Sequence, residues 1–97
     1  MTYAWEKLHL AMHTLAGGGS IKERLWDAYS LHLLHVNPDE LPEDVRPVLR
    51  QLREEFGGDD VEAAERAIRK LSEDQALARI DAILAIHDAV ARSEGSF

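Results

Sequence analysis

Apolar residues recur along the chain at the three- and four-residue spacing of amphipathic helices, and glycine, proline or polar residues separate the apolar segments. The spacing predicts helices over residues 3–16, 21–36, 42–56, 60–71 and 73–92. No stretch alternates apolar and polar residues as a half-buried strand does. The pattern therefore predicts an all-α fold, a compact bundle of about five helices in a single domain over residues 1–97.

The second predicted helix, residues 21–36, is expected at the centre of the bundle. Its apolar side chains point in nearly every direction around the helix axis, which is typical of a helix with neighbours on several sides. Leu33 lies on a face that is expected to meet a neighbouring helix, whereas Leu31 and Leu34 lie on a third face. The sequence leaves open whether this third face meets the same chain or another one.

Polar residues mark the expected helix starts. Three pairs have the spacing of a capping motif, namely Ser20 with Glu23, Asp59 with Glu62, and Ser72 with Gln75. Thr2 is the expected N-cap of the first helix. Pro47 removes a backbone donor, so we expect the third helix to bend near its start or to begin later than residue 42. Residues 93–97 are expected to form a frayed tail.

The chain has 97 residues, no cysteine and a net charge of −7. The absence of cysteine excludes disulfides, thiolate zinc sites and cysteine nucleophiles. Residues 37–75 carry twelve acidic and six basic side chains, a surplus of −6. This charge disfavours nucleic acid as a partner, because phosphate binding requires clustered lysine and arginine. The acidic residues either form a docking face for a basic partner or complement the dipoles of the helices near whose starts most of them lie.

The sequence also bears on location. No apolar run approaches the roughly 20 residues that a membrane-spanning helix needs. The first residues show no basic segment followed by an apolar run, which a secretory signal would have. We therefore expect no membrane partner and a cytoplasmic location.

Glu6, His9 and His13 have the spacing of metal ligands, because positions three and four apart lie one turn apart on the same helix face. His32 and His35 form a second pair. In an antiparallel hairpin, His32 lies about 6 Å along the axis from the level of His9, so the two pairs are not expected to share one ion. The preferred prediction has no cofactor and no metal site. A metal-binding protein or metal-dependent enzyme that uses Glu6, His9 and His13 is the alternative.

A further alternative is a small-ligand pocket around Trp26, Tyr29 and His32. His32 and His87 lie on apolar stripes, where a lone histidine is more often a core residue with a hydrogen-bond partner than a ligand. His87 and Asp88 do not form a catalytic dyad, because neighbouring residues of a helix point apart. No serine has the context of a nucleophile elbow. No catalytic residue is therefore predicted.

The preferred hypothesis is a small acidic, non-catalytic protein–protein interaction module, such as an adaptor, an inhibitor or an immunity-type protein. Its partner is another protein or a second copy of the same chain, in a homodimer. The chain has more apolar side chains than a single core is expected to bury. Four of them are the interface candidates, namely Leu31, Leu34, Ile86 and Val90.

Overall fold

The computed structural model describes residues 3–94, which are largely helical and contain no strand. The α-helices are α1 (Tyr3–Leu15), α2 (Ile21–Leu31), α3 (Arg46–Glu55), α4 (Val61–Lys70) and α5 (Glu73–Glu94). Three 3₁₀ turns connect α2 to α3, namely η1 (Leu33–His35), η2 (Pro38–Glu40) and η3 (Glu43–Val45). The prediction of a compact all-α bundle of about five helices is confirmed. Within the described range, no helix combines the length and the apolar character that crossing a membrane requires.

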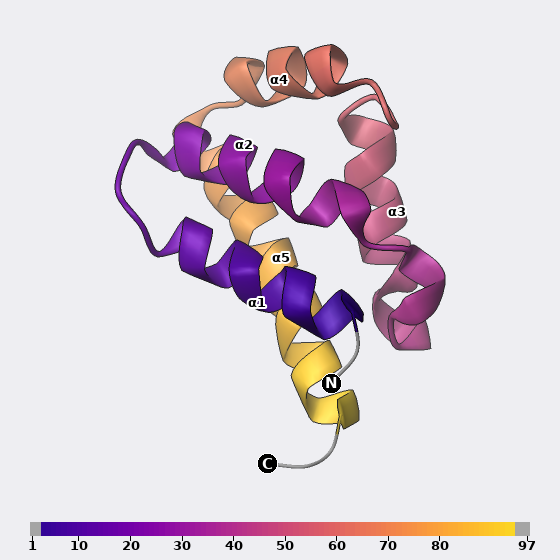
Figure 1. The fold of residues 1–97 in the computed structure, drawn as a ribbon. Coiled ribbons are helices and arrows are strands. Elements are labelled where there is room, and N and C mark those ends of the chain that lie inside the picture. Colours follow the sequence, from indigo (N-terminus) through magenta and orange to yellow (C-terminus); the bar gives the residue numbers. More distant parts are fainter. Residues whose placement is uncertain (1–2, 95–97) are drawn as a thin grey trace.

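The helices are arranged around α2 and α5. The α1–α2 hairpin lies across α5, α4 packs on α2, and α3 lies beyond the end of α2 (Figure 1). Contacts with α1, α4 and α5 place α2 at the centre of the bundle, as predicted. The third helix makes its main contacts with α5 and with the turns η2 and η3.

One cluster of apolar side chains forms the core. The largest fully buried side chains are Tyr29, Phe56, Leu8, Leu25, Leu33, Leu41, Leu49, Ile68, Ile83, Ile86 and Val36. They come from all five helices, from η1 and from the connecting segments. A single core therefore joins all five α-helices.

The second helix ends at Leu31 and not at residue 36, so its predicted length is wrong. The chain continues as the 3₁₀ turn η1. Arg53 of α3 contacts the segment that follows this end. Its guanidinium donates hydrogen bonds to the backbone carbonyls of Leu33, Leu34 and Val36. These bonds attach the segment after α2 to α3.

The third helix begins at Arg46, later than residue 42, and the later start predicted from Pro47 is confirmed. Pro47 lies in the first turn of α3. Proline is tolerated there, because a backbone N–H at that position would have no helical partner. The preceding residues form the separate turn η3, for which Pro42 is the N-cap.

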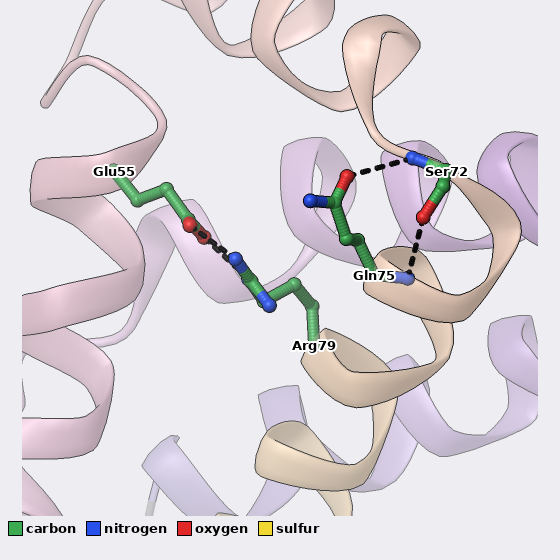
Figure 2. A network of polar contacts seen from close by, with 4 residues as sticks. All are labelled: Glu55, Ser72, Gln75 and Arg79. Carbon is green, nitrogen blue, oxygen red and sulfur yellow. Dashed lines mark hydrogen bonds and ion pairs between the residues drawn. The ribbon is translucent and has the colours of Figure 1, made fainter.

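Ser20 and Ser72 are N-caps, as the sequence predicts. The Ser20 hydroxyl accepts a hydrogen bond from the Glu23 backbone N–H at 3.1 Å. Ser72 and Gln75 exchange two hydrogen bonds, of 2.9 and 3.1 Å, between the side chain of each and the backbone N–H of the other (Figure 2). This reciprocal pair separates α4 from α5 and sets the direction in which α5 starts.

The cap of α4 is Asp60, one residue later than the predicted Asp59. The Asp60 carboxylate accepts a hydrogen bond from the Ala63 backbone N–H at 3.1 Å. The turn before it contains Gly57 and Gly58 at φ values of 87° and 69°. A Cβ on Gly57 would lie 2.8 Å from the Cβ of Ala63, so this position requires glycine both for its dihedral angle and for its space.

The helix α5 extends to Glu94, so the predicted tail over 93–97 is wrong for its first two residues. Residues 95–97 lie outside the described residues, as does the predicted N-cap Thr2. The remaining helix boundaries fall within two residues of the predicted ones.

Candidate functional site

A groove of about 550 Å³ lies between α3 and α5. Its apolar lining consists of Val48 and Leu52 on α3 and of Ala78 and Ala82 on α5. The alanines are four residues apart and therefore lie on one face of α5. Because alanine has no side chain beyond Cβ, α5 leaves the space beside α3 unfilled.

Polar side chains surround this apolar lining. They are Gln51, Glu54 and Glu55 on α3 and Arg79 on α5. The lining contains no histidine, serine, tyrosine or cysteine, and its ionisable side chains are Glu54, Glu55 and Arg79.

An ion pair crosses the groove. Arg79 points from α5 toward Glu55 on α3, and its Nε and Nη2 atoms lie 2.7 and 2.5 Å from the two carboxylate oxygens (Figure 2). Two parallel hydrogen bonds fix the orientation of both side chains more closely than a single contact would. The hydrogen bond to Glu55 raises the pKa of Arg79, which keeps the guanidinium charged. The pair therefore sets how α3 and α5 stand relative to each other at this point.

The rim of the groove is acidic. Glu55 is neutralised by Arg79, whereas Glu54 is exposed and forms no ion pair with any described residue. Gln51 is also exposed and adds an uncharged hydrogen-bonding group. A ligand that combines apolar groups with a positive charge would complement both the lining and the rim.

Two of the four interface candidates are in the core. Ile86 is 0% exposed and Val90 is 3% exposed, so neither can form part of a surface patch. Both lie on α5, which has α1 and α2 packed against it and therefore buries a wide face. Leu34 is half-buried against the core. Leu31 is 57% exposed and is the one candidate that lies fully on the surface.

The predicted metal ligands are only partly brought together. The Nε2 atoms of His9 and His13 lie 3.2 Å apart. Glu6 is exposed one turn away, and no three His, Asp or Glu side chains of residues 3–93 are arranged to hold one metal ion. The predicted set of three ligands is therefore not assembled. His32 and His35 belong to the other side of the hairpin, where His32 Nε2 lies 3.2 Å from the Thr14 hydroxyl.

The side chains of the predicted small-ligand pocket do not share a cavity. Trp26 lines a depression between α2 and α4. Tyr29 is fully buried edge-to-face against Phe56, with 5.0 Å between ring centroids, and its burial raises the pKa of the phenol. His32 contacts Thr14 of α1, and burial lowers the pKa of its imidazole. The central helix is closely packed at Tyr29, so Tyr29 does not line the depression beside Trp26.

His87 lies half-buried on the inner side of α5. Its Nε2 atom is buried and has no hydrogen-bond partner among the described residues. The His87 ring instead stacks near the His9 ring, with 6.3 Å between centroids. Burial lowers the pKa of His87, and the proximity of His9 lowers it further.

Several residues that define the groove were not singled out from the sequence. Glu55 and Arg79 are too far apart along the chain for any local spacing to indicate their pairing. The alanines at 78 and 82 did offer a signal, because two small residues four apart on one helix mark a face with little side-chain volume. Comparison of the chain with protein-family models, curated proteins and solved structures finds no match.

Proposed function

We propose that the protein is a non-catalytic protein–protein interaction module that holds an amphipathic helix of its partner in the groove between α3 and α5. An adaptor, an inhibitor or an immunity-type protein would work in this way. One observation carries the proposal, namely a preformed groove of about 550 Å³ with an apolar floor and a polar rim. Binding of an amphipathic helix in such a groove is a recurring mode of peptide recognition.

The floor supports a helix as the ligand. Leu52 is buried and Val48 and Ala82 are half-buried, so the floor offers apolar surface that a neighbouring side chain could cover further. A helix presents apolar side chains in a stripe at three- and four-residue spacing, which suits an elongated space between two helices. Apolar anchors that enter pockets of this kind supply most of the affinity in protein complexes.

The rim supports a partner with a positive charge beside its apolar stripe. Glu54 is exposed, unpaired within the described chain and placed on the rim. The chain as a whole carries a net charge of −7. Complementary charge speeds association and selects among partners more than it adds affinity. The partner helix is therefore expected to carry lysine or arginine next to its apolar residues.

A substitution that fills the groove tests the proposal. Ala78 lines the groove and is exposed, so Ala78→Trp should occupy the space without disturbing the core. Ala16→Trp is the matched control, because it adds the same side chain at an exposed position at the end of α1. Proteins captured from cells by the wild-type chain and by Ala16→Trp, but lost with Ala78→Trp, would support the groove as the binding site. Retention of the same proteins by Ala78→Trp would exclude it.

A further inference from the structure

Two histidines lie close together on the solvent-exposed side of α1, outside the α3–α5 groove. The Nε2 atoms of His9 and His13 are 3.2 Å apart. A neutral imidazole has one N–H and one nitrogen with a free lone pair. A hydrogen bond at this distance requires one ring that carries its proton on Nε2 and a second ring whose Nε2 lone pair is free.

The distance between these two Nε2 atoms matches the separation of two nitrogen atoms that bind the same metal ion. Imidazole nitrogen binds zinc at a distance of about 2.0–2.1 Å. Two bonds to the same ion meet at about 90° in square-planar and about 109° in tetrahedral geometry. Two imidazole nitrogens bound to one ion therefore lie roughly 2.8–3.4 Å apart. The observed 3.2 Å falls in that range. An ion could replace this hydrogen bond once both rings carry their proton on Nδ1 and have turned so that both Nε2 lone pairs point at the ion.

Neighbouring rings hold His9 in place. Trp5 stacks on it with 4.7 Å between centroids and an angle of 11° between planes. His87 lies near it, at 6.3 Å between centroids and 28° between planes. A ligand that is oriented before binding loses less conformational entropy when the ion arrives.

We propose that His9 and His13 form a two-histidine chelate for a late first-row divalent cation, namely Cu²⁺, Ni²⁺ or Zn²⁺. Imidazole favours these ions, whereas Mg²⁺ and Ca²⁺ favour oxygen ligands. No three His, Asp or Glu side chains of residues 3–93 converge on one ion, so this part of the chain supplies two ligands. Water, or ligands from a second molecule, fill the remaining positions. Among the three ions Cu²⁺ binds most tightly, as the order of stability of divalent complexes requires.

The site is independent of the proposed protein-binding groove, since its two ligands are on α1 and the groove is formed by α3 and α5. Failure of one proposal would leave the other in place. A second copy of the chain that supplied another histidine pair would complete a four-nitrogen site. A ratio of one ion to two chains and a ratio of one to one both agree with the chelate.

Calorimetric titration of the tag-free chain with Cu²⁺, Ni²⁺ and Zn²⁺ tests the chelate. His9→Gln and His13→Gln should each weaken binding at least about tenfold, the order of loss seen even when only the hydrogen-bonding partner of a metal ligand is removed. His35→Gln is the matched control, because it removes an exposed histidine on η1 and should leave the affinity within about twofold. Both test positions are exposed, so the variants are expected to fold.

A second readout does not depend on the variants. The chain has two tryptophans, and Trp26→Phe leaves Trp5 as the single one. Because Trp5 stacks on His9, Cu²⁺ bound at His9 should quench its fluorescence at the same concentrations that give the heat of binding. Absence of binding to the wild-type chain would overturn the proposal. Unchanged binding by either His9→Gln or His13→Gln would overturn it as well, because a chelate needs both nitrogens.

Discussion

The helices α1 and α3 both pack against α5, but different forces hold them there. α1 buries Ala4, Leu8, Ala11 and Leu15, one apolar side chain per turn. α3 also buries leucine, at positions 49 and 52, but arginines make most of its specific attachments. Arg53 binds the carbonyls after α2, Arg46 binds the Leu41 carbonyl at 2.9 Å, and Glu55 accepts from Arg79 of α5.

This difference explains where the groove lies. Close packing of apolar side chains leaves no room between α1 and its neighbours, since a protein interior is as dense as an organic crystal. Long charged side chains can join two helices across a gap, as Arg79 and Glu55 do (Figure 2). A groove therefore remains between α3 and α5, whereas the facing side chains of α1 and α5 are buried in the core.

The largest effect is expected from a substitution in the apolar attachment of α1. Leu8 is fully buried, and Leu8→Ala should lower the free energy of unfolding by about 2–5 kcal/mol, through lost apolar burial and the cavity that remains. Leu10, on the same helix, is 45% exposed, and Leu10→Ala should cost less than about 1 kcal/mol. Urea denaturation of the two variants measures the difference. Equal losses would mean that α1 is not held by its buried face.

A smaller loss is expected where α3 is attached by hydrogen bonds. Arg53→Met keeps the aliphatic stem but removes the donor to the carbonyls of Leu34 and Val36, whereas the Leu33 carbonyl keeps its bond from the Val36 N–H, so unfolding should become easier by about 1–3 kcal/mol. Arg50→Met, about one turn away, removes only an exposed pair with Asp39 and should change stability by less than about 1 kcal/mol. Denaturation curves that coincide for the two variants would contradict the role given to Arg53.

The ion pair across the groove should contribute less still. A double-mutant cycle with Arg79→Met and Glu55→Gln should give a coupling energy close to about 1 kcal/mol, the upper end for pairs that remain partly exposed, because the contact is bidentate. The exposed pair Arg92–Asp88 should give about 0.3–0.5 kcal/mol. High salt should reduce both values. A cycle energy near zero for the first pair would remove it as the link between α3 and α5.

The smallest effect concerns pH. Burial lowers the pKa of His32, and nearby Lys7 and His35 lower it further. The unfolded chain therefore takes up the His32 proton more readily than the folded chain does. The stability present above pH ~6.5, the ordinary histidine pKa, should decline as the pH falls below that value. His32→Gln should flatten the dependence of the urea midpoint between pH 7.5 and 5.5, and an equally steep dependence in this variant would rule His32 out as its source.

Local patterns predicted the helices and the α1 histidine pair, because both depend on residues three and four apart. They could not place Ile86 and Val90. The helix over 73–92 is apolar on more than one face, and its sequence does not say that α1 and α2 cover the face on which these two residues lie. Ile86 and Val90, two of the four predicted interface residues, are therefore part of the core.

Long-range polar contacts were beyond any local pattern. Arg53 lies near the end of the predicted helix 42–56, and nothing near it in the sequence indicates that it binds carbonyls in the segment after α2. Glu6 was grouped with His9 and His13 by spacing alone, although spacing does not fix the direction in which a side chain points.

We propose that the α3–α5 groove binds the partner. This binding site is tested most directly by adding the partner captured by the wild-type chain and measuring the change in backbone amide NMR signals. The amide signals of Val48, Leu52 and Ala82 are expected to shift or broaden most, and the amide signal of Leu31 is expected to stay unchanged. Changes confined to the exposed side of α1 and the end of α2, with the groove signals unmoved, would contradict it.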